Sequence, residues 1–264
     1  MTNSSSRTLE VTGIGPVDVT YNDQGMGRTF LLLHGGAGPA SVTSFADLLC
    51  RNGENRVLTP THPGFLGSPR SDALHDVKGL AALYVTLIEQ LELSDVMVIG
   101  NSIGGWIAAE VAILDSPGVN AVVIMDAVGI DVDEHPVADV STKSFPEIQN
   151  LSYFEPEKFR VDPSAFNDAQ RTMIASNLAT LSLYAGGSSM VDPTLRLRLR
   201  AISVPTLVIW GESDGIADVE YGRRYAAEIN GAEFVVMERT GHLPQLEAPD
   251  RLLPLLVEFA ARHP

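Results

Sequence analysis

The sequence predicts an α/β protein in which a mostly parallel central sheet is flanked by helices and carries a helical insertion. Three observations lead to this prediction. Apolar segments of strand length alternate with amphipathic segments of helix length, a serine between glycines stands where one apolar segment ends, and the alternation stops between residues 127 and 202. Alternating strands and helices are typical of a parallel sheet with helices on its faces.

Seven short apolar segments have the length and composition of strands, namely residues 17–21, 29–33, 56–59, 96–99, 121–125, 206–210 and 233–237. Five segments between and after them have a helical pattern, namely residues 44–51, 77–91, 106–114, 219–229 and 250–262. In residues 77–91 the apolar side chains recur on one side, which predicts a helix that packs on the sheet. A chain of 264 residues with 45% hydrophobic content can bury one large core of this kind.

The segment between residues 127 and 202 has a different pattern. Prolines punctuate it, helical patterns cover residues 163–184 and 193–201, and a Gly-Gly-Ser-Ser break at 186–189 separates the two. We therefore expect residues 1–126 and 203–264 to form the core domain and residues 127–202 to form a helical cap. A cap would cover the site and determine which substrate shape fits it. The alternative is a pair of packing helices that only lengthens the domain.

The sequence Gly100-Asn101-Ser102-Ile103-Gly104 is the strongest indication of chemistry. It lies where a strand passes into a helix, and a serine in such a sharp turn has a strained backbone and an exposed hydroxyl. The glycines leave room for the strand and the helix to approach each other. Ser102 is therefore the candidate nucleophile, and the Ile103 amide at the helix start is a candidate oxyanion donor.

A serine nucleophile needs a general base and a group that orients the base. Asp214 and His242 each follow a predicted strand, so that the chain order is Ser, Asp, His. Functional groups gather at the carboxyl ends of strands in open α/β sheets, and we expect the three residues to meet there. Asp126 follows the 121–125 strand and is an alternative acid for the same histidine.

A second oxyanion donor is predicted after the 29–33 strand, where His34-Gly35-Gly36 follows. The Gly36 amide would point at the oxyanion together with that of Ile103. His34 is expected to order this loop, whereas His62 and His75 are expected to be loop residues.

These motifs together resemble the α/β-hydrolase family, and the resemblance covers the chain after its polar amino terminus. It rests on the His-Gly-Gly loop, the His-Pro-Gly-Phe segment at 62–65, the serine turn, Gly-x-x-Asp at 211–214 and Gly-His at 241–242. The resemblance implies a parallel sheet wrapped by helices, a cap after the sixth strand and a triad of Ser102, His242 and Asp214.

The expected function is that of a serine hydrolase that cleaves a small, largely apolar carbonyl substrate, most simply a carboxylic ester or lactone, through an acyl-enzyme. One alternative is a carbon–carbon bond hydrolase of aromatic ring-cleavage products, because the Gly-Asn-Ser-x-Gly-Gly turn resembles that of those enzymes. They usually carry an aromatic residue after the base and a cap arginine. This chain has Leu243 after His242 instead. Its cap arginines are at 160, 171, 196, 198 and 200, of which Arg196, Arg198 and Arg200 alternate across opposite sides of a helix and are expected to be solvated. Another alternative is a small-molecule binding protein without catalysis on the same fold.

Composition excludes several classes of partner. The net charge of −15 argues against nucleic acid and anionic membranes, since phosphates would be repelled. The amino terminus lacks the apolar region of a signal peptide, and the apolar runs are too short to span a bilayer. A single cysteine, Cys50, forms no intrachain disulfide and is expected to be a buried thiol. We expect a cytoplasmic protein without a metal or cofactor, whose oligomeric state the sequence leaves open.

Overall fold

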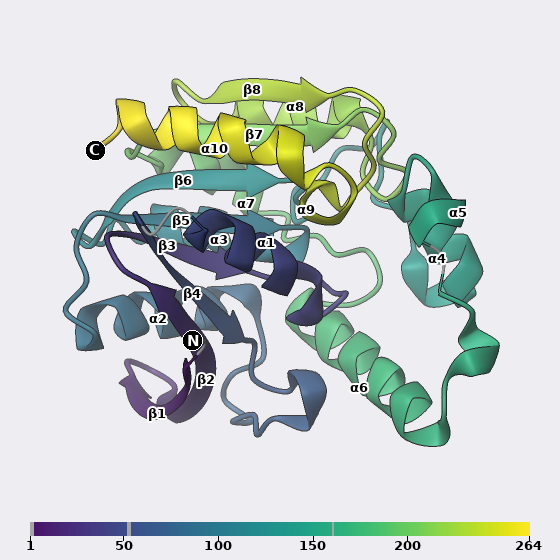
Figure 1. The fold of residues 1–264 in the computed structure, drawn as a ribbon, viewed down its shortest axis with the longest axis horizontal. Helices are drawn as coiled ribbons and strands as arrows, with labels where there is room; N and C mark the ends of the chain where they lie inside the picture. Colours follow the sequence, from purple (N-terminus) through teal and green to yellow (C-terminus); the bar gives the residue numbers. More distant parts are fainter. Residues whose placement is uncertain (1–2, 52–53, 160) are drawn as a thin grey trace.

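The computed structural model describes residues 3–51, 54–159 and 161–264, and its described residues are organised around one eight-stranded sheet (Figure 1). The strand order is β1-β2-β4-β3-β5-β6-β7-β8. The first two pairings, β1 with β2 and β2 with β4, are antiparallel, and every later pairing is parallel. The strands are β1 (Asn3–Val11), β2 (Gly15–Gly25), β3 (Arg28–Leu33), β4 (Asn55–Thr61), β5 (Val96–Asn101), β6 (Val119–Met125), β7 (Thr206–Gly211) and β8 (Glu233–Met237).

Helices cover both faces of the sheet. One core forms where α2 (Val77–Gln90), α3 (Ile103–Ile113) and α8 (Val219–Ala227) pack on the sheet, and it contains Tyr84 and Trp106. The other forms under α1 (Ala40–Cys50) and α10 (Pro249–Arg262), and it contains Phe45 and Phe259. Every residue of β5 is buried, as expected for a parallel strand covered on both faces. Cys50, at the end of α1, is only partly buried.

The segment between β6 and β7 contains further helices, of which α4, α5 and α6 lie beyond the carboxyl ends of the strands and α7 lies behind the sheet (Figure 1). They are α4 (Phe145–Ser152), α5 (Pro156–Phe159), α6 (Asp168–Tyr184) and α7 (Leu195–Arg198), with 3₁₀ turns at Val140–Thr142, Pro163–Ala165 and Leu199–Ala201. The helix predicted over 163–184 is thus a 3₁₀ turn followed by α6. Asn167 caps α6 through a hydrogen bond from the Gln170 amide.

The predicted α/β fold with a mostly parallel sheet is confirmed, but one strand was not predicted. Residues 3–11 form β1, which pairs with β2 along the sheet edge. Its sequence is polar and Ser-rich, and between residues 4 and 11 its buried side chains are Leu9 and Val11. Such an edge strand gains its order from backbone pairing, which leaves no apolar pattern to detect. No helix in the described part of the chain is both long and apolar enough to cross a membrane.

Candidate active site

Ser102 lies in a strained turn between β5 and α3. Its backbone has φ 60° and ψ −122°, a conformation that side-chain-bearing residues rarely adopt. The turn is possible because a Cβ on Gly100 would lie 2.0 Å from the carbonyl oxygen of Gly104, and a Cβ on Gly104 would lie 2.4 Å from that of Leu33. Glycine is therefore required at both positions for the strand and the helix to pack this closely.

The loop after β3 lies against this turn. A Cβ on Gly35 would be 3.0 Å from the Ser102 Cβ, so the Gly36 amide belongs to a backbone in contact with the serine. Ile103 is the first residue of α3, where amides lack an intrahelical partner. The structure therefore brings both predicted oxyanion donors to the same side of the sheet as Ser102.

His242 and Asp214 form a buried pair at the ends of β8 and β7. The His242 Nδ1 lies 2.8 Å from Asp214 Oδ2, and the side chains are 7% and 0% exposed. The other carboxylate oxygen, Oδ1, accepts hydrogen bonds from the amides of Ile216 and Ala217, at 2.7 and 3.1 Å. These two amides fix the carboxylate, and the carboxylate in turn orients the imidazole.

The alternative acid, Asp126, is in the same place but has a different partner. It is completely buried after β6, and its Oδ1 accepts a hydrogen bond from the Gly211 amide at 2.7 Å. One ligand atom each of Asp126, Asp214 and His242 lies within 4.8 Å of the others. In the structure it is Asp214, and not Asp126, whose oxygen is hydrogen-bonded to the imidazole. One imidazole nitrogen is therefore engaged by a carboxylate, as in a catalytic dyad, and we do not assign this cluster as a metal site.

Asn101, next to the serine, connects the turn to the histidine loop. Its Nδ2 donates to the carbonyl oxygen of His242 at 2.8 Å, and its Oδ1 accepts from Gln245 Nε2 at 3.1 Å. Asn101 and Gln245 are buried. The sequence does not indicate a role for either side chain, because nothing in it links positions 144 residues apart.

A pair of buried histidines holds the loop that carries Gly36. His34 Nε2 accepts from the His62 amide at 3.1 Å, so the ring proton of His34 is on Nδ1, which donates to the Gly35 carbonyl at 2.7 Å. His62 Nε2 donates to the His34 carbonyl at 2.9 Å, and its Nδ1 accepts from Tyr84. Burial lowers the pKa of His62 to about 4 and that of His34 well below its usual range.

This network confirms that His34 orders its loop. His62 lies in the loop after β4, as expected, and its side chain is fully buried between His34 and Tyr84. The physical reason is that Nδ1, Nε2 and the backbone amide of His62 all make hydrogen bonds inside the core.

The 127–202 segment contacts the loops of the candidate triad through its backbone. Two carbonyls at the end of α4 accept hydrogen bonds from these loops. The Leu151 carbonyl accepts from the Gly215 amide at 2.9 Å, and the Ser152 carbonyl accepts from the His242 amide at 2.8 Å. The acid loop and the base loop are thus both bonded to the same helix end.

Helix α6 contacts the oxyanion side. A Cβ on Gly36 would lie 2.7 Å from Leu181, and the Leu66 amide donates to Asn177 Oδ1 at 2.9 Å. Thr180 Oγ1 donates to the Gly64 carbonyl at 3.2 Å. Both sides of the candidate site are therefore in contact with the 127–202 segment.

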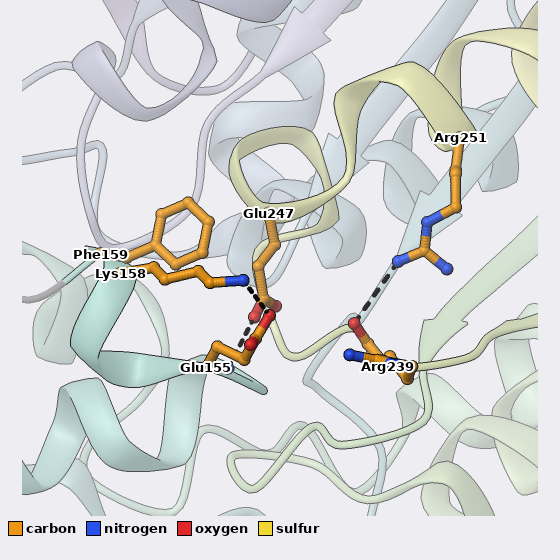
Figure 2. A pocket seen from close by; sticks show the side chains of 6 residues that line it. All are labelled: Glu155, Lys158, Phe159, Arg239, Glu247 and Arg251. Carbon is orange, nitrogen blue, oxygen red and sulfur yellow. Dashed lines mark hydrogen bonds and ion pairs between the residues drawn. The ribbon is translucent and has the colours of Figure 1, made fainter.

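A pocket of about 290 Å³ lies beside the histidine loop (Figure 2). Its lining is mostly charged, with Glu155, Lys158, Phe159, Arg239, Glu247 and Arg251. Glu247 accepts hydrogen bonds from the amides of Gly241, Phe154 and Glu155, and thus connects the histidine turn to the segment that follows α4. None of the predicted catalytic residues lines this pocket. Its charged side chains pair with one another or with backbone, except that Arg239 lies over the Phe154 ring, and we interpret the pocket as a structural junction.

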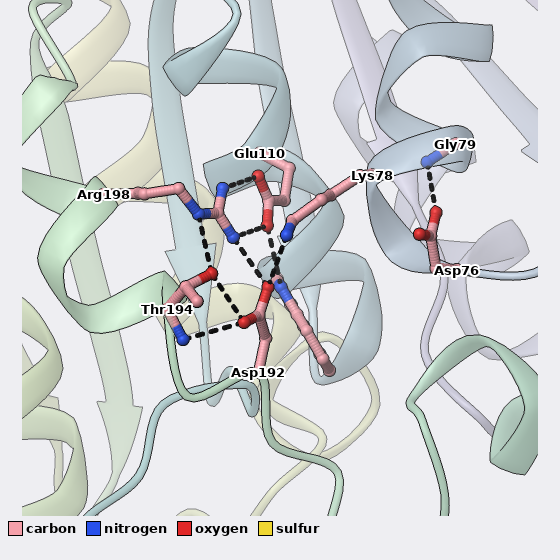
Figure 3. Close-up of polar contacts among 8 residues, drawn as sticks. Asp76, Lys78, Gly79, Glu110, Asp192, Thr194 and Arg198 are labelled. Carbon is pink, nitrogen blue, oxygen red and sulfur yellow. Dashed lines mark hydrogen bonds and ion pairs between the residues drawn. The ribbon is translucent and has the colours of Figure 1, made fainter. Parts of the chain in front are cut away.

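The arginines near the end of the 127–202 segment are paired with acids. Arg198 contacts Glu110 at two oxygens and Asp192 at 2.8 Å, and Lys78 reaches Asp192 at 2.9 Å (Figure 3). Burial alone would raise the pKa of Asp192, but hydrogen bonds from Thr194 and Lys78 lower it to about 2.

The expectation that the helix arginines are solvated is wrong for Arg198, whose side chain is 28% exposed. A buried carboxylate on α3, Glu110, requires a cation, and Arg198 supplies it. Arg196 and Arg200 both pair with Glu228 on the core. Arg171 is exposed on α6, and Arg160 lies outside the described residues.

The family assignment follows from comparison with known proteins. Residues 30–255 match the model of the alpha/beta hydrolase family, and the chain belongs to that family. The fold fits this class through its sheet, and the candidate site fits it through the serine turn and the chain order of Ser102, Asp214 and His242.

Three similar proteins are informative. The chain is 25% identical to the 2-hydroxy-6-oxo-6-(2'-aminophenyl)hexa-2,4-dienoic acid hydrolase of Metapseudomonas resinovorans, over 94% of this chain and 89% of that protein. It is 26% identical to the 2-hydroxy-6-oxo-2,4-heptadienoate hydrolase of Pseudomonas putida, over 99% of both. Among solved structures, a serine hydrolase involved in carbazole degradation superposes with a TM-score of 0.75 at 22% identity, covering 99% of this chain and 100% of the other. The last likeness concerns the fold.

Proposed function

We propose that the chain is a serine hydrolase in which Ser102, His242 and Asp214 form the catalytic triad. The observation that carries the proposal is the buried His242–Asp214 contact at 2.8 Å, tied through Asn101 to the strained serine turn. In such a triad the imidazole takes the serine proton as the hydroxyl attacks a carbonyl, and the aspartate stabilises the imidazolium that forms.

The Gly36 and Ile103 amides are the proposed oxyanion hole. They would bind the negatively charged oxygen of the tetrahedral intermediate, and each such donor is worth roughly 3 to 4 kcal/mol in comparable enzymes. His242 then returns the proton to the leaving group, and a water that the same histidine activates releases the acid from Ser102. The residues 127–202 would serve as the cap that shapes the small-molecule site.

For the bond that is cleaved, we place carbon–carbon hydrolysis of a 2-hydroxy-6-oxo-dienoate first. Two relatives that align over nearly their whole length are named for substrates of this class. In that reaction Ser102 attacks the 6-oxo carbonyl, the bond between C5 and C6 breaks, and C5 receives a proton from His242. The products are a carboxylic acid and a 2-hydroxydienoate, and one water is consumed.

Hydrolysis of a carboxylic ester is the second candidate, and the cationic residues favour it. A dienoate substrate carries a carboxylate that a cation would bind, yet Arg196, Arg198 and Arg200 are each paired with a carboxylate of the protein. Leu243 follows His242 in place of the aromatic residue expected for the carbon–carbon hydrolases. A neutral ester would need neither an unpaired cation nor an aromatic residue after the histidine.

The experiment that tests the proposal compares both substrate classes on the same protein. A 2-hydroxy-6-oxo-dienoate is followed by loss of its dienolate absorbance, and p-nitrophenyl esters are followed by nitrophenolate release, with Ser102→Ala in parallel. Turnover by the wild type and none by Ser102→Ala, together with a fluorophosphonate adduct on Ser102, supports the triad, and the ratio of kcat/KM values assigns the bond. Turnover that persists in Ser102→Ala, or no adduct and no turnover, would overturn it.

A further inference from the structure

Asp126 is a second buried carboxyl group beside the candidate triad, and one of its oxygens has no ordinary partner. Its side chain is completely buried, and Oδ1 accepts from the Gly211 amide at 2.7 Å. For Oδ2, the described part of the chain offers no N–H or hydroxyl donor. A charged, buried carboxylate oxygen without a donor would be costly, and so its surroundings indicate its protonation state.

Those surroundings are negatively charged. Asp214 is the nearest acid, within 4.8 Å, and Glu247 is a second acid that acts on Asp126. The same cluster contains His242, whose Nδ1 is committed to Asp214. Burial, and then the charge of Asp214, raise the pKa of Asp126 well above its ordinary value, although the Gly211 amide lowers it. Two carboxylates this close in a dry site do not both ionise.

We propose that Asp126 is a positioning residue, which keeps its proton and donates it in a hydrogen bond from Oδ2 to the carboxylate of Asp214. This inference rests on the proposed function, because it assigns Asp214 as the triad acid. Asp214 then receives donors from three directions: the amides of Ile216 and Ala217, the imidazole, and the Asp126 carboxyl. The neutral carboxyl holds Asp214 in the orientation that His242 needs, without adding a second negative charge next to the imidazole.

Backbone geometry is consistent with a fixed role for this residue. Asp126 has φ 46°, a left-handed conformation that is uncommon outside glycine. Its amide donates to the Ile209 carbonyl at 3.0 Å, while its carboxyl accepts from Gly211 on the same strand. Backbone and side chain are thus both attached to the end of β7, just before the loop that carries Asp214.

The first test replaces Asp126 by groups that keep or lose the donor. Asparagine has the same shape and a permanently neutral N–H donor, so Asp126→Asn is expected to keep kcat/KM within about threefold of the wild type, whereas Asp126→Leu is expected to lower kcat by about tenfold or more with little change in KM. Asp133→Asn, at an exposed aspartate, is the matched control. A loss of activity in Asp126→Asn as large as in Asp126→Leu would overturn the proposal.

The second test reads the charge of Asp126 directly and does not depend on turnover. The pKa of His242, measured by NMR, is expected to be the same in Asp126→Asn and the wild type, because a neutral group replaces a neutral group. If Asp126 were ionised, removing its charge would lower that pKa by about one unit or more. Glu247 and Asp214 face the site in both proteins, so their contributions cancel. If the proposed triad were wrong, Ser102 would not be labelled by the fluorophosphonate, whereas the NMR comparison of the two proteins would be unaffected.

A third test uses the proximity of Asp126 to His242. In Asp214→Asn the repelling charge is gone, so Asp126 can ionise and supply part of the lost stabilisation of the imidazolium. Asp214→Asn is therefore expected to keep about tenfold more activity than Asp126→Asn/Asp214→Asn, with its activity rising with pH as Asp126 ionises. Equal activities for the single and the double variant would contradict the assignment.

Discussion

The Nδ2 of Asn101 lies 2.8 Å from the carbonyl oxygen of His242, so the residue before the candidate nucleophile holds the backbone of the candidate base. The contact joins the ends of β5 and the loop after β8, which are not adjacent in the sheet. The separation between serine and histidine is therefore set by one buried side chain and not only by the sheet.

Asn101→Ala is expected to damage both stability and turnover. It leaves the His242 carbonyl and the Gln245 amide without their buried partner, which costs about 1 to 3 kcal/mol in the free energy of unfolding. We also expect kcat to fall, because the histidine loop is released from the serine turn. Denaturant unfolding and steady-state kinetics measure the two effects, with Asn230→Ala at an exposed asparagine as the control. Unchanged stability would show that Asn101 does not hold the loop.

Gly36→Ala is expected to lower kcat because the new methyl group would lie 2.7 Å from Leu181 Cδ2 and push α6 and the oxyanion loop apart. The neighbour is the end of a flexible side chain, so space can be restored. Gly36→Ala/Leu181→Ala is therefore expected to recover activity relative to Gly36→Ala, measured on the same ester or dienoate. If the double variant is no better, the loss arises from the loop backbone and not from this contact.

Arg198→Ala is expected to destabilise the protein by roughly 3 kcal/mol, because it leaves the buried carboxylate of Glu110 without its cation. Replacing both partners, in Arg198→Met/Glu110→Met, is expected to cost much less. Arg200→Ala, which removes an exposed partner of Glu228, is expected to cost about 1 kcal/mol or less. Thermal or denaturant unfolding of the three variants checks this order, which a larger loss in Arg200→Ala would contradict.

The free energy of unfolding is expected to decrease at acid pH because His62 is buried in its neutral form. Its folded pKa of about 4 lies below the ordinary value of 6.5, so the unfolded chain binds the proton more tightly than the folded protein. The contribution of His62 to the free energy of unfolding is fully present above pH 6.5. It is lost as the pH falls toward 4, which lowers the free energy of unfolding by at most about 3 kcal/mol. Asp126 acts in the opposite direction, since its folded pKa is raised.

The difference between two proteins isolates the His62 contribution. The free energy of unfolding of the wild type is expected to approach that of His62→Gln as the pH falls from 6.5 to 4, while His75→Gln, at an exposed histidine, follows the wild type throughout. A constant difference between wild type and His62→Gln would show that His62 does not titrate in this window.

Most of the sheet could be predicted because buried parallel strands are continuous apolar segments, as in β5. The helices α4 and α5 could not, because Pro146 and Pro156 look like helix breakers. In the structure both stand in a first helical turn, where a missing amide hydrogen costs nothing. The prolines therefore mark where helices begin.

The candidate site was predictable residue by residue but not in its connections. Ser102, Asp214 and His242 follow strands, and a parallel sheet brings strand ends together. Asp126 also follows a strand, and only the register of β6 against β7 shows that it bonds to Gly211 instead of His242. The contacts of Asn101 and His62 depend on how distant loops fold over the sheet, which local sequence does not encode.

The 127–202 segment is attached to the core in two different ways. Near its start, the carbonyls of Leu151 and Ser152 hold the acid and base loops, and these bonds are independent of side-chain identity. Near its end, Asp192 and Arg198 are locked to Lys78 and Glu110 by charge. Between these attachments α6 meets the core through side chains, since Asn177 accepts from the Leu66 amide and Thr180 donates to the Gly64 carbonyl. Under the proposed function, an exchange of α5 and α6 for those of a relative that preserves these two contacts is expected to alter the substrate while the candidate triad keeps its own attachments.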